Sequence, residues 1–224
     1  MIFRQSVDER SLVMDMLYAK DIVEMVGSMT QIIIENEVYF CDLDSHAGDG
    51  DFGMSLAKGF KELKKEWSQL GKEDIGAFLM GCGLTITEFC GGASGPIWGS
   101  AFRSAGKYAA GRTSLSLKEF AELMQSAVEG IQKRGGAKLG DKTLLDALIP
   151  ATESLKNSAE VGTEIYEAME ISAQEAVLGA ERTKAIAATR GRASYLGERS
   201  IGFPDAGAAA LGIIFTGIVE RLRS

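Results

Sequence analysis

Apolar residues recur at helical spacing along almost the whole chain, and this periodicity constrains the fold more than any other feature of the sequence. Ile22, Val26, Met29 and Ile33 advance by 4, 3 and 4 positions, which places them on one face of a helix. The same kind of spacing predicts seven more helices, over about residues 53–70, 72–90, 96–110, 116–131, 141–158, 163–188 and 205–222. Only 3 of the 224 residues are proline, so little interrupts these helices. We therefore predict an all-α fold, a bundle of eight helices, with one short strand-like run at Val38–Cys41.

Polar residues mark where several of these helices are expected to begin. Ser116 followed by Glu119 has the spacing of a capping box, in which two backbone amides are satisfied reciprocally. Asp141 and Asp205 each precede a periodic segment, and both are predicted N-caps.

No repeat, low-complexity tract or linker divides the sequence, so we expect a single domain over residues 1–224. The longest apolar stretch, residues 206–219, is shorter than the ~20 residues that a membrane span needs. Charges occupy the N-terminal segment where a signal peptide would have its apolar core. The three cysteines have neither a paired framework nor metal-type spacing, which suits a reducing compartment. These features predict a cytoplasmic protein.

The charge balance limits the partners that the chain can have. It holds 24 Lys and Arg against 31 Asp and Glu, a net charge of −7, and it has no basic run. Such a chain is poorly suited to nucleic acid or to an anionic membrane, so neither is expected as a partner. If it binds phosphates, it needs a cation to do so.

Glycine and polar residues gather in four joints between the predicted helices. These joints are residues 42–53, 91–96, 134–143 and 189–207. Alternate loops of an up-down bundle lie at the same end. The four joints are therefore expected to meet at one end, where their backbone amides could hold a ligand.

The first joint carries three carboxylates, Asp44, Asp49 and Asp51, within eight residues. Carboxylates this close repel one another unless a cation compensates. All-oxygen ligands favour Mg²⁺ or Ca²⁺, and Mg²⁺ usually leaves coordination positions for substrate phosphates. The alternative is a solvated turn, since Asp and Gly are ordinary turn residues.

Other known loops fit this chain less well. An EF-hand beginning at Asp42 would need Gly and Glu where the chain has Ala47 and Gly53. The glycines at 48, 50 and 53 match a dinucleotide-binding pattern, but no parallel sheet follows to complete that fold. The GDKT run at 140–143 is one residue out of register with a phosphate-binding Walker A loop, and its alternative interpretation is a cap of the sixth helix.

Two further residues have both a functional and a structural interpretation. His46 is the one histidine of the chain, and an exposed loop residue without a role is favoured over a catalytic base. Arg192 lies near Arg190, Glu198 and Arg199, so it either contacts a phosphate or belongs to a surface salt-bridge cluster.

Four motifs carry a resemblance to a known family. The motifs occur in the family's order and span nearly the whole chain. They are GDGDFG with an Asp five residues before its first Asp, GGASGP at 91–96, GDKT at 140–143 and GRASYLGERSIG at 191–202. With them the chain resembles the nucleotide-binding L subunit of dihydroxyacetone kinase (the DhaL family) and the C-terminal domain of single-chain ATP-dependent kinases. The resemblance implies an eight-helix antiparallel barrel that binds its nucleotide at one end.

The resemblance also implies the residues of the site. Asp44, Asp49 and Asp51 would hold two Mg²⁺ ions, and Arg192 would act in catalysis on the phosphates of ADP or ATP. The nucleotide contacts carry over to Phe52, Gly53, Met54, Ser55, Ala93, Ser94, Gly135, Leu144, Arg192, Asp205, Ala206 and Gly207. Many L subunits of the phosphotransferase-system type have His at the position of Phe52 and Pro at that of Ala206, so the phosphoryl donor of this chain stays open.

The implied function is that of half an enzyme. A separate K subunit would carry dihydroxyacetone, or a related small ketose, covalently on a histidine, and this chain would supply the phosphoryl group. An M-type subunit with a phosphohistidine could recharge bound ADP, or ATP could exchange freely. Phosphoryl transfer consists mostly of positioning and charge neutralisation, so no protein nucleophile is required. The alternative is a regulatory nucleotide sensor that binds a partner without turnover.

Overall fold

The computed structural model describes residues 16–223, and helices dominate this part of the chain. Its elements, in order, are β1 (Leu17–Tyr18), α1 (Ala19–Glu35), α2 (Glu37–Ser45), α3 (Phe52–Glu66), α4 (Ile75–Phe89), α5 (Ser94–Tyr108), β2 (Ser114–Leu115), α6 (Leu117–Gly135), α7 (Leu145–Val161), α8 (Ile165–Arg182), the 3-10 segments η1 (Thr183–Ala185) and η2 (Arg192–Ser200), and α9 (Ala206–Leu222). β1 and β2 form one short antiparallel ladder, in which Leu17 pairs with Leu115.

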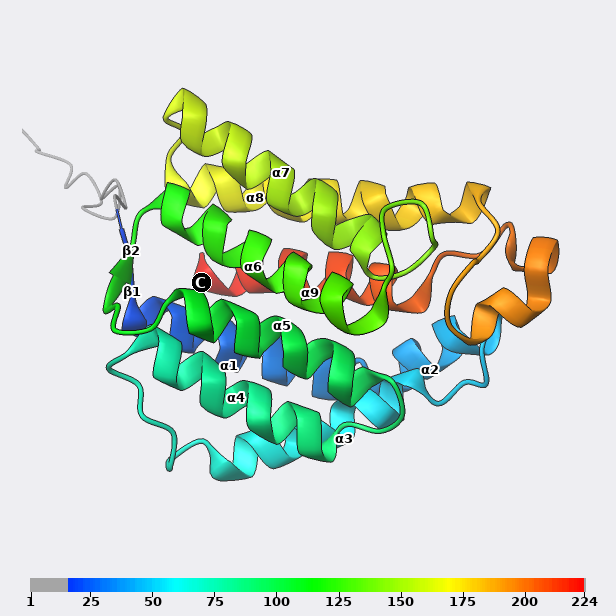
Figure 1. Cartoon of the computed structure of the whole chain (residues 1–224), viewed down its shortest axis with the longest axis horizontal. Coiled ribbons are helices and arrows are strands. Elements are labelled where there is room, and N and C mark those ends of the chain that lie inside the picture. The colour runs from blue at the N-terminus through cyan, green and yellow to red at the C-terminus, as the bar shows by residue number, and fades with distance from the viewer. Residues whose placement is uncertain (1–15, 224) are drawn as a thin grey trace, which may run out of the picture.

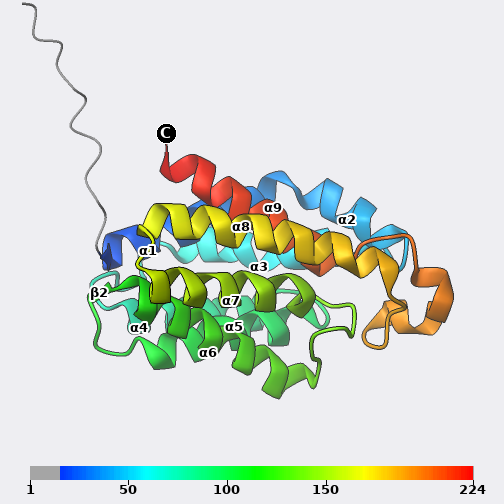
Figure 2. The same cartoon turned by 90° about the horizontal axis from the view of Figure 1, so that it is seen from above.

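Eight of the helices close into a barrel. From α3 to α9 each helix packs against the next one in the chain, and α1 fills the gap between α9 and α3. Neighbouring helices run in alternating directions, with the β1–β2 ladder at one end of the barrel and the segment containing η2 at the other (Figures 1 and 2). The predicted all-α, eight-helix antiparallel barrel is thus confirmed.

The sequence pattern missed α2, which packs outside the ring against α3 and α9. The strand-like run Val38–Cys41 lies within this helix, so the strand prediction was wrong. Phe40 is fully buried and its ring lies 6.1 Å from that of Phe52, whereas Val38 is 82% exposed. A helix on the surface of the barrel buries only one side, and here Phe40 supplies the buried side chain. This tertiary packing overrides the β preference of Val and Tyr.

The predicted helix caps had mixed outcomes. The Ser116–Glu119 capping box is present at the start of α6, and the Asp205 carboxylate accepts a hydrogen bond from the Ala208 amide at the start of α9. Asp141 is not an N-cap, because α7 begins only at Leu145. Near that helix start the Asp146 carboxylate accepts the Gly140 and Thr143 amides instead, which leaves Asp141 free to bond elsewhere.

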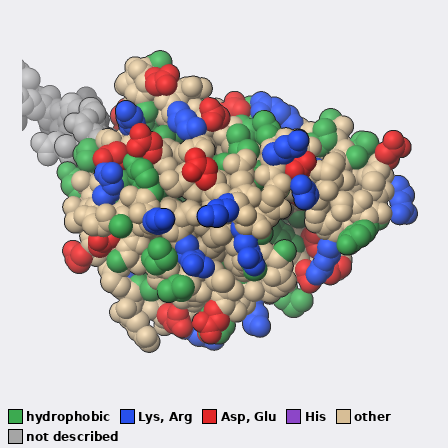
Figure 3. All heavy atoms as spheres, viewed as in Figure 1, with side chains coloured by type: hydrophobic (Ala, Val, Ile, Leu, Met, Phe, Trp, Pro, Cys, Tyr) green, Lys and Arg blue, Asp and Glu red, His purple; other side chains and the backbone are tan. Residues whose placement is uncertain are grey.

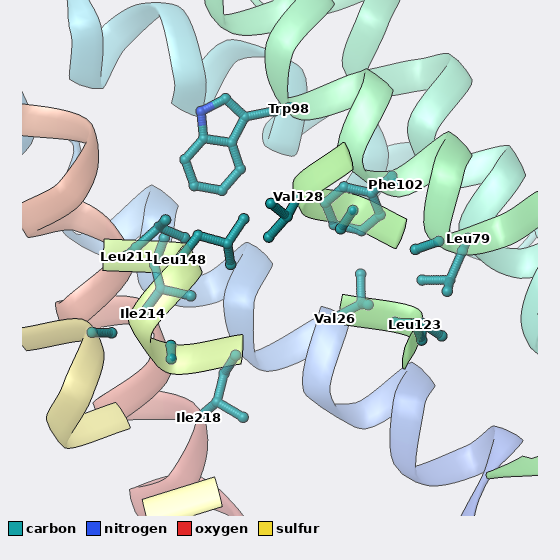
Figure 4. Packing of buried hydrophobic residues seen from close by; sticks show 14 of the residues in the cluster. Val26, Leu79, Trp98, Phe102, Leu123, Val128, Leu148, Leu211, Ile214 and Ile218 are labelled. Atoms are coloured by element: carbon teal, nitrogen blue, oxygen red, sulfur yellow. The ribbon is translucent and has the colours of Figure 1, made fainter. Parts of the chain in front are cut away.

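The core lies inside the barrel, where apolar side chains from facing helices meet (Figure 4). Between them remains an apolar pocket of about 150 Å³, lined on different helices by residues such as Val26, Leu79, Trp98, Leu148 and Leu211. Every barrel helix except α3 contributes to this lining.

The outer face in Figure 3 carries acidic and basic side chains interspersed, without a large patch of either sign. From residue 16 to residue 223, no helix combines the length and apolar character that a membrane span requires.

Candidate nucleotide and metal site

All four glycine-rich joints meet at one end of the barrel, as the topology predicted. They enclose a cleft of about 230 Å³. Most of the predicted site residues line it, namely Asp44, Asp49, Asp51, Phe52, Ser55, Ala93, Ser94, Leu144, Arg192, Asp205, Ala206 and Gly207. Asp44 and Gly207, 163 positions apart in the sequence, are therefore brought together by barrel closure.

Three predicted residues do not line the cleft. Gly53 is buried against α2, where a Cβ atom would lie 2.0 Å from the Glu37 carbonyl oxygen, so glycine is required for the packing of α2 on α3. Met54 is 58% exposed, and Gly135 ends α6 beside Ile97.

The cleft also has walls that the sequence reasoning did not identify. Apolar side chains of Leu43, Ile97 and Trp98 line it, together with Lys142 and Arg190. Ile97 and Trp98 follow the GGASGP joint directly and face inward on the first turn of α5, a position that helical periodicity alone could have suggested.

The three acidic side chains converge on one point. One carboxylate oxygen from each of Asp44, Asp49 and Asp51 lies within 4.8 Å of the other two. Asp44 lies in the last turn of α2, Asp51 directly precedes α3, and the Asp44 carboxylate accepts the Gly50 amide at 2.9 Å. A Cβ atom on residue 48 would lie 2.1 Å from the Asp44 carboxylate, so any larger residue there would displace this candidate metal ligand. Three convergent carboxylates are a donor set that fits a hard divalent cation.

Arg192 faces the same acidic loop. Its guanidinium pairs with the carboxylate of Asp49 and lies 3.3 Å from that of Asp51. Arg190 lies 3.7 Å from Asp141. The interpretation of Arg192 as one member of a surface cluster with Glu198 therefore finds no support, because the arginine reaches across the cleft to the candidate metal ligands.

The helix dipoles at this end add positive potential. α3, α5, α7 and α9 all begin at the cleft, and helix N-termini attract anions through their free amides and aligned peptide dipoles. The N-cap residues of α3 and α5 are Asp51 and Ala93, and neither side chain bonds to its helix. In the first turns of these helices the Met54 amide donates to the Cys41 sulfur and the Ser94 amide to the Gly91 carbonyl oxygen, and Pro96 has no N–H. The amides of Phe52, Gly53 and Gly95 are left for phosphate oxygens.

His46 is exposed and lies beside the cleft rather than in its wall. Its Nδ1 atom is 2.9 Å from the Asp42 carbonyl oxygen, and its ring centroid is 4.8 Å from that of Phe203. These contacts support a structural role in holding the acidic loop against residue 203.

Asp205 is the titratable group of the cleft with the most perturbed environment. Burial raises the pKa of Asp205 to about 7, and the nearby Asp146 and Asp44 carboxylates act in the same direction. The protonated form is thus favoured by folding up to near-neutral pH.

This environment predicts a pH-dependent effect of Asp205→Asn. Because the folded state binds the proton more tightly than the unfolded state, the ionisation of Asp205 lowers the free energy of unfolding as the pH rises from about 4 to about 7. Asn loses no proton and can still accept the Ala208 amide. We expect the Tm of Asp205→Asn minus the Tm of wild type to increase from pH 5 to pH 8. Each kcal/mol by which wild type loses free energy of unfolding should add roughly 2–4 °C to this difference.

The matched control is Asp74→Asn at the half-buried N-cap of α4, where the side chain accepts the Ala77 amide at 2.8 Å and the Gly111 amide at 2.9 Å. Its Tm difference from wild type should stay flat over the same pH range. Parallel pH profiles for wild type and Asp205→Asn would contradict the assigned environment of Asp205.

Comparison with known proteins identifies relatives of this chain. The DAK2 domain family matches residues 46–220. The chain is 36% identical over 190 residues to the PEP-dependent dihydroxyacetone kinase, ADP-binding subunit DhaL, of Escherichia coli, covering 85% of this chain and 90% of that subunit. It is 32% identical over 205 residues to the PTS-dependent counterpart of Lactococcus lactis, covering 92% of this chain and 98% of that subunit. The chain therefore belongs to the DAK2 domain family, among the kinase subunits of the DhaL type.

Longer relatives contain the same unit as a part. The L-erythrulose 1-kinase of Mycolicibacterium smegmatis is 31% identical over 206 residues, which cover 91% of this chain but 36% of that protein. The crystal structure of the dihydroxyacetone kinase from C. freundii in complex with AMP-PNP and Mg²⁺ has a TM-score of 0.69 at 24% identity and covers 99% of this chain and 37% of that one. At this identity the structural match shows the shared fold.

Proposed function

We propose that the chain is the Mg²⁺-dependent, ADP- or ATP-binding phosphotransferase subunit of a dihydroxyacetone kinase. The observation that carries this proposal is the convergence of three carboxylates, four helix N-termini and Arg192 on one cleft. The E. coli and L. lactis relatives, named as ADP-binding subunits, and the C. freundii complex with AMP-PNP and Mg²⁺ support it.

Each part of the cleft has a role in this proposal. Asp44, Asp49 and Asp51 hold two Mg²⁺ ions, the number that the family resemblance implies. When bound, the metal neutralises phosphate charge and orients the phosphates. The amides of Phe52 and Gly53 in α3 and of Gly95 in α5 donate to phosphate oxygens, and Arg192 neutralises the charge that develops on the transferred group.

The apolar wall supplies the rest of the binding site. Leu43, Ile97 and Trp98 exclude water from the cleft and offer a surface for the flat base of a nucleotide. The remaining predicted contacts, including Ser55, Ser94 and Gly207, lie where they can meet the nucleotide.

The acceptor is a small ketose, dihydroxyacetone or a relative, held on a separate K subunit. The E. coli and L. lactis relatives, which this chain matches over at least 90% of their length, are named as subunits, and this supports a separate partner that holds the ketose. The phosphoryl donor is either ATP or an M-type phosphohistidine subunit that recharges bound ADP, and we place this chemistry in the cytoplasm.

A thermal-shift experiment tests nucleotide and metal binding together. If Mg-ADP binds only the folded state, ligand at ~100 times its Kd adds about 2.7 kcal/mol to the free energy of unfolding. For a chain of this size we expect the Tm to rise by roughly 5–10 °C. EDTA should remove the shift, because the acidic loop then repels the phosphates.

Adenosine is the matched control ligand, since it lacks the phosphates and should gain little from Mg²⁺. The absence of any shift with Mg-ADP would overturn the nucleotide assignment. A shift that persists in excess EDTA would overturn metal bridging.

A further inference from the structure

The segment that carries Arg192 leaves the barrel after η1 and returns at α9. We call residues 186–203 the strap. Figure 2 shows it projecting beyond the end of the helices. Tyr195 in its outer part, the tip, is 87% accessible, and besides the ion pairs of Arg192 with the acidic loop its polar contacts gather at its base.

Lys142 occupies that base and bonds to both ends of the strap. Its ammonium group donates to the carbonyl oxygens of Ile186 at 3.1 Å, Ser200 at 2.6 Å and Phe203 at 2.8 Å. These bonds account for all three ammonium protons, and the residue is only 1% exposed. A side chain so committed has no proton left for a ligand, although it lies in the wall of the cleft.

The backbone of Lys142 is also unusual. With φ at 61°, it is the one non-glycine residue among residues 16–223 in the left-handed region. Such a conformation persists where the surroundings compensate for its cost, and it often occurs at functional sites. Here it turns the side chain from the joint before α7 into the base of the strap.

Neighbouring contacts strengthen the same connection. The Thr189 hydroxyl donates to the Asp141 carboxylate at 2.8 Å, and the Ala188 amide donates to the Ser200 hydroxyl at 2.9 Å. The Gly202 amide donates to the Lys184 carbonyl oxygen at 2.8 Å. The base of the strap is thus cross-linked by several hydrogen bonds, whereas the exposed part around Tyr195 is held to the barrel through the ion pairs of Arg192.

We propose that Lys142 is a positioning residue that fixes the base of the strap, so that Arg192 reaches the acidic loop and the phosphates bound there. This inference rests on the proposed function for the role of Arg192 toward phosphates. Its structural part, that Lys142 holds the strap, is independent of any ligand.

The structural part is tested by hydrogen exchange on the ligand-free protein. In wild type, the amides of Ala188 and Gly202 should exchange at least about tenfold more slowly than those of the strap tip. Lys142→Met keeps the length of the side chain but removes its donors, and it should abolish that difference. Lys138→Met, an exposed lysine in the same joint, should leave exchange unchanged.

Lys142→Gln is a second, milder variant for the case that Lys142→Met does not fold, because its amide can still donate two hydrogen bonds. It should give an intermediate exchange rate. If neither variant folds by circular dichroism, the wild-type measurement decides, since a base that exchanges as fast as the tip overturns the proposal. Unchanged exchange in a folded Lys142→Met variant also overturns it.

A double-mutant cycle tests the functional part. Calorimetric titration with Mg-ADP should show Arg192→Ala and Lys142→Met each weakening binding by about 10–100-fold. If Lys142 acts through Arg192, then adding Lys142→Met to Arg192→Ala should cost no further affinity. A merely structural role would instead give additive losses, and that result would overturn the positioning role.

The cycle also separates this inference from the proposed function. If wild type binds no Mg-ADP, the proposed function fails, while the exchange experiment still decides whether Lys142 holds the strap. If Lys142→Met loses affinity but the strap stays protected, Lys142 contacts the phosphates itself and the positioning role is wrong.

Discussion

Asp49→Ala and Asp51→Ala are each expected to lose at least ~100-fold in Mg²⁺-dependent ADP affinity, about 2.8 kcal/mol. Both carboxylates belong to the convergent triad with Asp44, and a divalent cation deprived of one of so few protein ligands is held far less tightly. Isothermal titration calorimetry with ADP at saturating Mg²⁺ measures the effect.

The fold should survive these changes. Asp49 is exposed, and the Asp51 side chain makes no cap bond to α3, so circular dichroism should show unchanged helix content. The matched control is Asp42→Ala, an exposed carboxylate of the same segment that lies outside the triad, and it should bind ADP as wild type does. Unchanged affinity in both triad variants would refute the metal-site assignment.

The isolated chain is expected not to phosphorylate dihydroxyacetone with ATP. His46 is its only histidine, and it lies beside the cleft against Phe203, so it is not placed to bind the ketose covalently. A freely diffusing small ketose lacks the positioning that can be worth ~7–11 kcal/mol of the barrier. Because the cleft lies at the open end of the barrel, the bound phosphates face a docked partner instead.

Activity should appear when a cognate K subunit is added together with ATP or with the phosphohistidine donor. A coupled assay of dihydroxyacetone phosphate, with each component omitted in turn, identifies the donor. His46→Gln should retain the reconstituted activity and serves as the control for the lone histidine. Robust turnover by this chain alone would refute the interpretation that the activity is divided between two subunits.

The sequence by itself determined the elements that depend on local periodicity. The 4, 3, 4 spacing on α1 and the Ser116–Glu119 capping box act over a few residues, so helix positions and one helix start followed from short-range physics. The acidic loop was visible for the same reason, because Asp44, Asp49 and Asp51 are close in the chain as well as in space.

Only the tertiary structure decided which distant segments meet. The hydrogen-bond partners of Lys142 are 44, 58 and 61 residues away in the sequence. From the sequence alone the GDKT run looked like a helix cap, so the buried position of the Lys142 ammonium group could not be predicted. Likewise, α2 exists because Phe40 packs against the barrel near Phe52, a gain in buried apolar area that no local pattern encodes. Contacts between segments far apart arise only when the barrel closes, because closure sets which backbone carbonyls and which carboxylates share one end of the molecule.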